Sequence, residues 1–257
     1  MATRYLPHSQ LYMGAGRVLY CGPLQHLDTH VYGADVLHVG IYGPFRMMLE
    51  DGEWRAYRCA VVPAGIPHAL DLAGGVHGKL FVERHGPAWT FLRSRYPGLE
   101  RAVTSFDDPA TVECFRRVHE EDPSPDVLAG YVDRLLGSRS PAPVLRCDER
   151  VRHAIDLICR EPDRNFSQAE LAERVGLSPS RFLHLFRQHT GVPYRRFRNW
   201  KRMVAAVQSL HGADNMTRAA LDAGFADATH FSHSFRHTFG VNPAPVFRRI
   251  ERFEVAS

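Results

Sequence analysis

The sequence predicts a multidomain α+β protein, in which an N-terminal antiparallel β-barrel is followed by a helical linker and an all-α region. Short β-branched or aromatic runs, broken every eight to twelve residues by Gly, Pro or Asp-Gly, extend from about residue 12 to 82, and this pattern is typical of an antiparallel sandwich or barrel. Helical periodicity returns near residue 107, and the last part of the chain repeats one helical pattern. These observations place the domains at 1–105, 106–144 and 145–257.

The repeated helical pattern occurs twice, 49 residues apart. Residues 182–192 and 231–241 share Phe, His, Phe, Arg, Gly and Val at six of eleven positions. Each copy follows a short helical run and a glycine, Gly176 or Gly224, that can adopt the left-handed conformation of a tight turn. The order helix, turn, helix, present twice, predicts two helix-turn-helix units.

The two units lie at about 167–190 and 216–239. In both, the second helix is predicted to have one apolar face and one polar face. Phe182 and Phe186 stand four residues apart in the first unit, so they form one apolar stripe while the other positions point elsewhere. A single stripe would indicate only a small helical domain. Its duplication favours helices that present a polar face to the major groove of DNA.

The positions outside these stripes, together with two arginines of the segment between the units, are the candidate DNA-binding residues. Arginine in the first unit can bind guanine in bidentate fashion, whereas the second unit offers mainly neutral donors that discriminate less. The basic helical segment 193–210 between the units spans about 27 Å, near the ~34 Å of one DNA turn. The candidates are Ser180, Arg181, Leu183, His184, Arg187, Arg195, Arg196, Ala228, Thr229, His230, Ser232, His233 and Arg236.

The distribution of charge agrees with a nucleic-acid partner for the repeated region. The chain carries a net charge of +4, but residues 141–257 hold 18 Lys and Arg against 12 Asp and Glu, and the remainder holds 14 against 16. A basic half attracts phosphate groups, so the half with the repeats is the half expected to meet double-stranded DNA.

Composition and motif content exclude several other classes of protein. The five cysteines are scattered without a C-x-x-C pair, as expected for reduced thiols, and no apolar run is long enough for a signal peptide or a membrane span. We therefore expect a cytoplasmic protein without membrane contact. No P-loop, G-x-G-x-x-G or Ser-His-Asp pattern indicates an enzyme or a nucleotide cofactor.

Residues from about 166 to 249 resemble the AraC/XylS family of bacterial transcription regulators. The resemblance rests on Gly224-Phe225, on F-x-x-x-F-R from Phe231 to Arg236, and on G-V-x-P from Gly240 to Pro243. It implies a sequence-specific regulator, an activator rather than a repressor, that binds promoter DNA and contacts RNA polymerase. It also implies a small-molecule effector bound by the N-terminal domain.

A short segment of the strand-rich half, residues 63–68, resembles the P-x-G-x-x-H turn of cupin barrels. The H-x-H and glutamate of metal-binding cupins are missing, so we predict no metal ion and an organic effector instead. Its candidate lining residues are Arg46, Trp54 and His68. A cupin enzyme or a metal-responsive sensor with a DNA-binding tail remains the alternative.

The helical segment between about residues 107 and 137 has two interpretations. Its apolar positions could pack against the barrel, or they could form a homodimer contact, as helices at this place do in the resembling family. The sequence leaves both open. The Gly-, Ser- and Pro-rich stretch 137–143 that follows is predicted to be a flexible linker.

Overall fold

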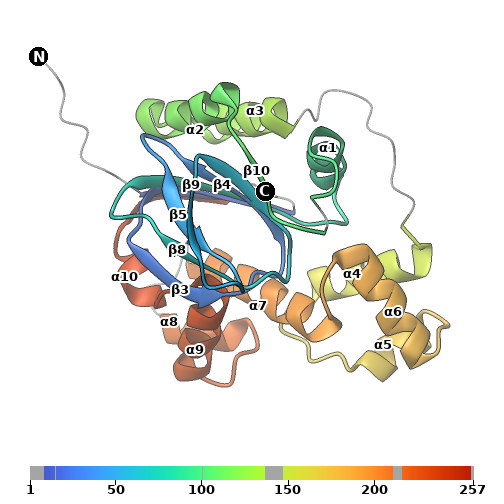
Figure 1. Cartoon of the computed structure of the whole chain (residues 1–257). Helices are drawn as coiled ribbons and strands as arrows, with labels where there is room; N and C mark the ends of the chain where they lie inside the picture. Colours follow the sequence, from blue (N-terminus) through green and yellow to red (C-terminus); the bar gives the residue numbers. More distant parts are fainter. Residues whose placement is uncertain (1–8, 15, 100, 137–146, 211–215, 256–257) are drawn as a thin grey trace, which may run out of the picture.

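Two β-sheets and ten helices, three of them short, make up the described chain, which in this computed structural model comprises residues 9–14, 16–99, 101–136, 147–210 and 216–255 (Figure 1). The strands are β1 Ser9–Gly14, β2 Arg17–Pro23, β3 His26–His30, β4 Asp35–Gly40, β5 Phe45–Met48, β6 Trp54–Tyr57, β7 Cys59–Val62, β8 His68–Asp71, β9 Val76–Val82, β10 Thr104–Phe106 and β11 Ile250–Val255. The helices are α1 Pro87–Arg95, α2 Pro109–Glu121, α3 Pro125–Leu136, α4 Glu149–Arg160, α5 Gln168–Arg174, α6 Pro179–Thr190, α7 Tyr194–Leu210, α8 Met216–Asp222, α9 Ala228–Phe239 and α10 Pro243–Phe247.

The larger sheet has the order β10-β7-β4-β9-β2-β1-β11 and the smaller one β3-β8-β5-β6. All neighbouring strands are antiparallel except β1 and β11, which run parallel. Side chains alternate along each strand, so Leu80 and Val82 of β9 face one side of the larger sheet and Lys79 and Phe81 face the other. Both sides are buried and need a covering layer.

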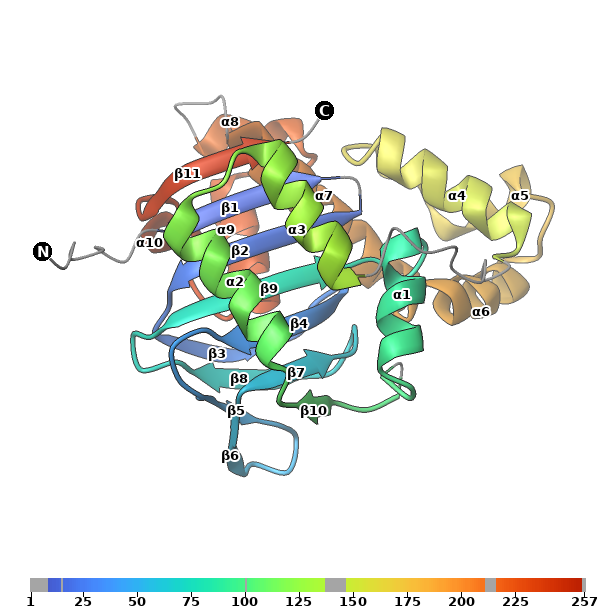
Figure 2. The same ribbon diagram turned by 90° about the horizontal axis from the view of Figure 1, so that it is seen from above.

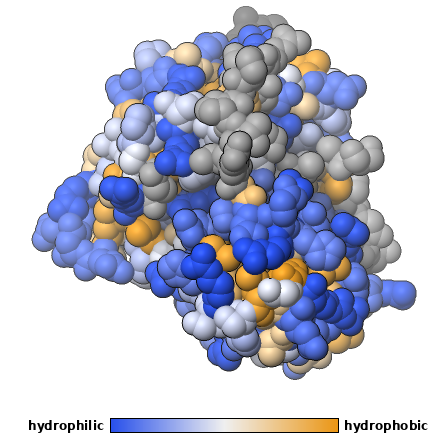
Figure 3. Space-filling model, turned by 90° about the vertical axis from the view of Figure 1, so that its right-hand side faces the viewer, coloured by the Kyte–Doolittle hydropathy of each residue, from blue (hydrophilic) through white to orange (hydrophobic). Residues whose placement is uncertain are grey.

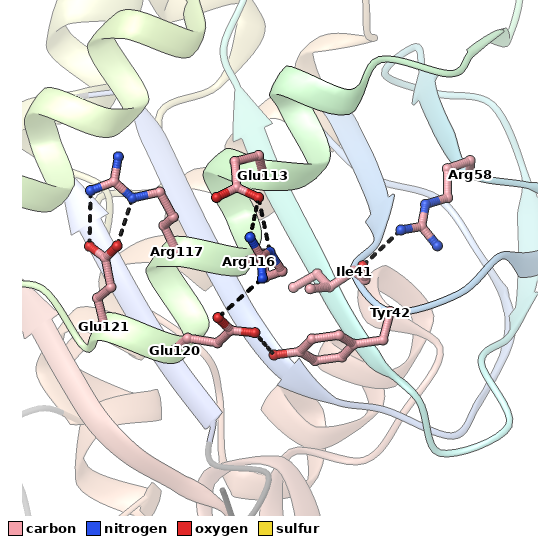
Figure 4. Close-up of polar contacts among 8 residues, drawn as sticks. All are labelled: Ile41, Tyr42, Arg58, Glu113, Arg116, Arg117, Glu120 and Glu121. Atoms are coloured by element: carbon pink, nitrogen blue, oxygen red, sulfur yellow. Dashed lines mark hydrogen bonds and ion pairs between the residues drawn. The ribbon is translucent and has the colours of Figure 1, made fainter. Parts of the chain in front are cut away.

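Helices α2 and α3 cover the first side (Figure 2). Phe115, Val118 and Val132 pack onto β-strand residues such as Leu80, so the apolar stripe of this segment faces the sheet. The exposed face of α2 carries a ladder of ion pairs, among them Arg117 with Glu121 and Arg116 with Glu113 and Glu120, and Glu120 also accepts a hydrogen bond from Tyr42 (Figure 4).

The opposite side of the larger sheet is covered by two different layers. The smaller sheet lies over β4, β7 and β9, and its residues Leu27, Phe45 and Met47 pack with Val36 and Phe81. The second helix-turn-helix unit lies over β1 and β2 instead (Figure 2). The β-structure is therefore an open pair of sheets, because helices occupy the place where a closed barrel would continue.

The prediction of a strand-rich region followed by a tandem helix-turn-helix region is confirmed, with two corrections. The strands form two sheets rather than the expected closed barrel. The region expected to be all-α ends in β11, which extends the larger sheet through pairs such as Leu11 with Phe253. Propensity alone could not show this, because a lone C-terminal strand needs a distant edge to pair with. The predicted linker 137–143 lies outside the described residues.

The two helix-turn-helix units differ in how they bury their apolar faces. The first unit packs Phe182 and Phe186 with α4 residues such as Ile155, and Ala64, in the loop between β7 and β8, is the member of this cluster that comes from the N-terminal half. The second unit packs Phe231 and Phe235 together with strand residues of the larger sheet, including Leu11, Met13 and Tyr20. The first unit therefore has a core of its own, and the second shares one with the N-terminal half.

The buried phenylalanine stripe of the second unit leads to a prediction about the stability of the protein. Phe231→Ala should lower the free energy of unfolding by about 3–5 kcal/mol, because Phe231 is buried and its removal leaves a cavity. His233→Ala, on the exposed face of the same helix, is the matched control and should change it by less than about 0.5 kcal/mol. Chemical denaturation followed by circular dichroism measures both, and equal losses would contradict the assignment of faces.

Candidate DNA-binding surface and interdomain cavity

Helix α6 is fixed at both ends by signals that the sequence supplies. The Ser178 hydroxyl accepts a hydrogen bond from the backbone N–H of Arg181, and Pro179 occupies the first turn. Gly191 ends the helix with φ of 78°, in the left-handed region. These caps determine which residues of α6 face outward.

The outward face of α6 consists of the residues predicted to read DNA. Ser180, Arg181, His184 and Arg187 are exposed and Leu183 is partly buried, whereas Phe182, Leu185 and Phe186 are buried. Figure 3 shows the side of the molecule that bears α4–α6, and hydrophilic residues cover much of it. The face is thus open to a partner.

Helix α9 repeats this arrangement. The Asp227 carboxylate accepts a hydrogen bond from the backbone N–H of His230, and Gly240 ends the helix with φ of 72°. The predicted residues Thr229, His230, His233 and Arg236 are exposed, and Ala228 and Ser232 are partly buried.

The C-terminal end of α9 is also attached to strand β3. Arg236 forms an ion pair of 2.7 Å with Asp28, and the backbone N–H of Asp28 donates to the carbonyl oxygen of Gly240 at 2.9 Å. A Cβ on Gly240 would overlap the carbonyl oxygen of Asp28, so this position requires glycine. Arg236 therefore has a carboxylate partner in the N-terminal half, while the first turns of α9 remain exposed.

Helix α7 joins the units and lines a polar groove of about 560 Å³ between them. Arg195 is exposed in this groove. Sequence analysis left Arg198 and Arg202 outside the candidate set, although they share its basic helical spacing. Both line the groove, and both donate to backbone carbonyl oxygens near the start of α5, Arg198 to that of Phe166 and Arg202 to that of Pro162.

Arg196 has a different environment from Arg195. It is partly buried, and its guanidinium lies beside Gly65 in the loop that resembles the cupin turn. Burial and the neighbouring Arg187 lower the pKa of Arg196. The loop before β8 thus contacts the first unit.

The structure does not bring the three predicted effector residues together. Arg46 is exposed and stacks on Trp54, with its guanidinium carbon 5.6 Å from the ring centroid, on the outer face of the smaller sheet. His68 is buried between the sheets. The outward direction of Arg46 follows from strand alternation beside the buried Phe45 and Met47, which the sequence pattern did not resolve.

His68 belongs to a buried cluster of polar side chains that sequence analysis missed. Its ring lies 4.4 Å from that of His30 and 5.5 Å from that of His38, which contacts His77 at 3.0 Å between ring nitrogens. Four ring nitrogens of these histidines are buried without a hydrogen-bond partner. Within the described ranges, no group of three His, Cys, Asp or Glu side chains has a metal-binding arrangement.

Lys79 lies at the junction of the histidine cluster with an apolar cavity of about 80 Å³. The cavity lies between β1, β2 and β9 on one side and α7, α9 and α10 on the other, and its lining includes Phe81, Trp200 and Phe239. Among the described residues that line it, Lys79 is the charged one. The cavity therefore combines largely apolar walls with the single ammonium group of Lys79.

The ammonium group of Lys79 has no carboxylate partner within the described part of the chain. Its Nζ donates a hydrogen bond to the Tyr32 hydroxyl at 3.0 Å, and burial lowers its pKa to about 7. One feature of the sequence distinguishes Lys79 from the other basic residues. Only two of the 32 basic residues are lysines, namely Lys79, which lines the cavity between the halves of the molecule, and Lys201, which binds Glu83 across their contact.

The buried histidines make stability depend on pH. Burial lowers the pKa of His68 to about 4 and those of His30, His38 and His77 well below their usual value, so these rings stay neutral in the native state. As pH falls from 6.5 towards 4, the unfolded chain binds protons that the native chain does not. The free energy of unfolding should therefore fall by about 1.4 kcal/mol per pH unit for each histidine.

Urea denaturation between pH 7.5 and 5 checks this expectation. His68→Asn should reduce the dependence on pH by the contribution of one group, and His233→Asn on the exposed face of α9 should leave it unchanged. A pH dependence that is the same for both variants would be evidence against the buried neutral histidine.

Comparison with known proteins agrees with the architecture. Residues 171–249 match a helix-turn-helix domain family. The HTH-type transcriptional activator RhaS of Escherichia fergusonii is 35% identical over 100 residues, which cover 38% of this chain and 36% of that protein. The arabinose operon regulatory protein of Escherichia coli is 36% identical over 100 residues, or 34% of its length. The matched part thus spans about a third of these curated relatives.

Crystal structures of ToxT from Vibrio cholerae share the fold over nearly the whole chain. One has a TM-score of 0.60 at 12% identity and covers 92% of this chain and 98% of its own. Another, with an unsaturated fatty acid bound, has a TM-score of 0.58 at 11% identity and covers 91% and 96%. No helix in the described part of the chain is long and apolar enough to cross a membrane. Residues 171–249 are thus a helix-turn-helix region similar to those of the AraC-type regulators RhaS and the arabinose operon regulatory protein.

Proposed function

We propose that the chain is a sequence-specific DNA-binding transcription regulator, an activator, whose N-terminal half senses a small organic effector. The observation that carries the first part is the pair of helices α6 and α9. Each is capped in the same way, buries one phenylalanine stripe and leaves a polar face exposed. Helix α7, with 17 residues and a length of about 26 Å, separates them by a distance suited to successive major grooves.

Base readout is assigned mainly to the first unit. Arg181→Ala should weaken binding to the regulator's own promoter by about 1–3 kcal/mol and relax one base position, because arginine recognises guanine through two hydrogen bonds. Arg195→Ala is the matched control. It removes an exposed arginine of α7, so it should weaken promoter and random DNA alike.

Mobility-shift titrations of both variants on promoter and random DNA, at several salt concentrations, measure these losses. An Arg181→Ala variant that loses the same affinity on both DNAs would show that Arg181 contacts phosphate only. If the full chain shows no salt-dependent DNA binding, the proposal that it is a DNA-binding regulator is wrong.

The proposed effector is a compact apolar carboxylate held in the cavity beside Lys79. A buried ammonium group without a counter-ion gains stability from an anionic ligand, and the rest of the lining favours an apolar body. The fatty acid bound to ToxT has the same combination of groups. A free volume of about 80 Å³ holds only a few carbon atoms, so longer acids require side chains such as Phe239 to move.

Lys79→Met should abolish binding of carboxylates, because it keeps the apolar length of the side chain and removes the charge. Calorimetric titration with straight-chain carboxylates of about four to ten carbons, and with the alcohols of equal length, measures the effect. The affinity of the wild type for the acids should fall as pH rises above about 7, where Lys79 loses its proton. Equal binding of acids and alcohols would contradict the proposal.

One observation favours a second candidate, a metal-responsive sensor, namely the four buried histidines with unpartnered ring nitrogens. Metal analysis of the purified protein distinguishes it, since a resident metal ion would support this candidate over an organic effector. Contacts with RNA polymerase and homodimer formation remain predictions. Helices α2 and α3 bury their apolar stripe on the sheet, so a dimer contact there would use their outer faces.

A further inference from the structure

The carboxylate of Glu83 joins the two halves of the molecule. One of its oxygens accepts a hydrogen bond of 2.9 Å from Trp200 Nε1, and the other forms an ion pair of 2.6 Å with Lys201 Nζ. His85 Nε2 lies 3.2 Å from the second oxygen. Glu83 is only 6% exposed, so this junction is shielded from water and salt.

The ionised state of this junction follows from its neighbours. Burial acts to raise the pKa of Glu83, but Lys201 and His85 together hold it below its usual value. Burial acts to lower the pKa of Lys201, but Glu83 holds it above its usual value. Both groups are charged at neutral pH, and breaking one partner leaves the other as an uncompensated buried charge.

Glu83 is in line with the effector cavity. It directly follows β9 and continues its pairing, since its backbone N–H donates to the carbonyl oxygen of Gly16. Because side chains alternate along a strand, Lys79, Phe81 and Glu83 lie on one face. Lys79 and Phe81 line the cavity, and the Phe81 ring lies 5.4 Å from that of Trp200. These three side chains thus form one row, from the ammonium group of Lys79 to the carboxylate of Glu83.

The residues that Glu83 binds lie in the middle of the connector helix. Trp200 and Lys201 are near the centre of α7, which spans Tyr194–Leu210 and leads from the first unit to the second. Backbone of the N-terminal half also lies close to the base of the tryptophan side chain, because a Cβ on Gly33 would overlap that of Trp200. The N-terminal half therefore contacts the centre of α7 at both Glu83 and Gly33.

We propose that Glu83 is the positioning residue that couples the effector cavity to the two DNA-binding units, by holding the centre of α7. The inference rests on the proposed function and adds the route of regulation. An effector that fills the cavity contacts Phe81 and Trp200, and the Glu83 junction transmits their displacement to α7 as a whole. The spacing of α6 and α9 then differs between the free and occupied states, which gives the effector different affinities for them.

Three variants test the junction. Glu83→Gln keeps an oxygen acceptor for Trp200 Nε1 and removes the charge that holds Lys201. Adding Lys201→Met to it removes the buried cation that would otherwise be left unpaired. Gly33→Ala leaves both charges in place and displaces Trp200 by steric overlap. The matched control is Asp28→Asn, which breaks the exposed interdomain ion pair with Arg236.

Three measurements are made on the full-length protein. Calorimetry gives the affinity for a saturated eight-carbon carboxylate, and mobility shift gives the ratio of promoter dissociation constants with and without it. Hydrogen–deuterium exchange follows the amides of α7. In the two Glu83 variants, carboxylate affinity should stay within about threefold of wild type. In these variants and in Gly33→Ala, the ratio should approach one and exchange in α7 should accelerate. Asp28→Asn should keep the wild-type ratio and exchange.

Two outcomes overturn the inference. A Glu83→Gln/Lys201→Met variant with the wild-type ratio and unchanged α7 exchange would show that the junction does not position the helix. Loss of carboxylate affinity in that variant would place Glu83 in the effector site instead. If the wild type itself does not respond to carboxylates, the effector part of the proposed function fails, and α7 exchange alone then decides whether Glu83 positions the helix.

Discussion

The structure depends on one constraint, which is that the larger sheet has two apolar faces and a single polypeptide must cover both. Helices α2 and α3, together with α1, cover the first face. The smaller sheet covers only part of the second, and the remaining strands, β1 and β2, bury Leu11, Met13 and Tyr20 against the second helix-turn-helix unit. A module expected to act on DNA is at the same time a structural layer of the N-terminal half.

This dual role explains why two units of similar sequence have different surroundings. The core of the first unit is formed by residues of the C-terminal half, and Ala64 is the contribution of the N-terminal half. The unit can therefore change position at a small cost in buried apolar surface. The second unit is held by shared core contacts, by the attachment of α9 to β3, and by β11, which returns to pair with β1. Under the proposed function, regulation acts on the position of the first unit relative to the second unit, through α7.

Among the described residues, the buried acidic and basic side chains are Asp35, Lys79 and Glu83, and each lies near the contact between the halves. Asp35, fully buried, pairs with Arg84, whose guanidinium lies against Gly191 at the end of α6. Glu83 pairs with Lys201 on α7. Buried ion pairs contribute little net stability but penalise any arrangement that separates them. They therefore define one relative placement of the halves, whereas Lys79 has no such carboxylate partner among the described residues.

The sequence by itself determined the local features of this protein. Helix caps at Ser178 and Asp227, phenylalanines four residues apart and the repeated glycine turns are set within a few neighbouring residues, so the two units and the outward faces of α6 and α9 could be predicted. The strand-rich half was recognisable from residue type and turn spacing. Tertiary structure alone decided the open pair of sheets, the pairing of β11 with β1, and the meeting of Lys79 with an apolar cavity. Arg46 and Trp54 were separated from His68 for the same reason. These features depend on contacts between residues far apart in the chain, and such contacts are selected by the need to cover a whole sheet face rather than by any local pattern.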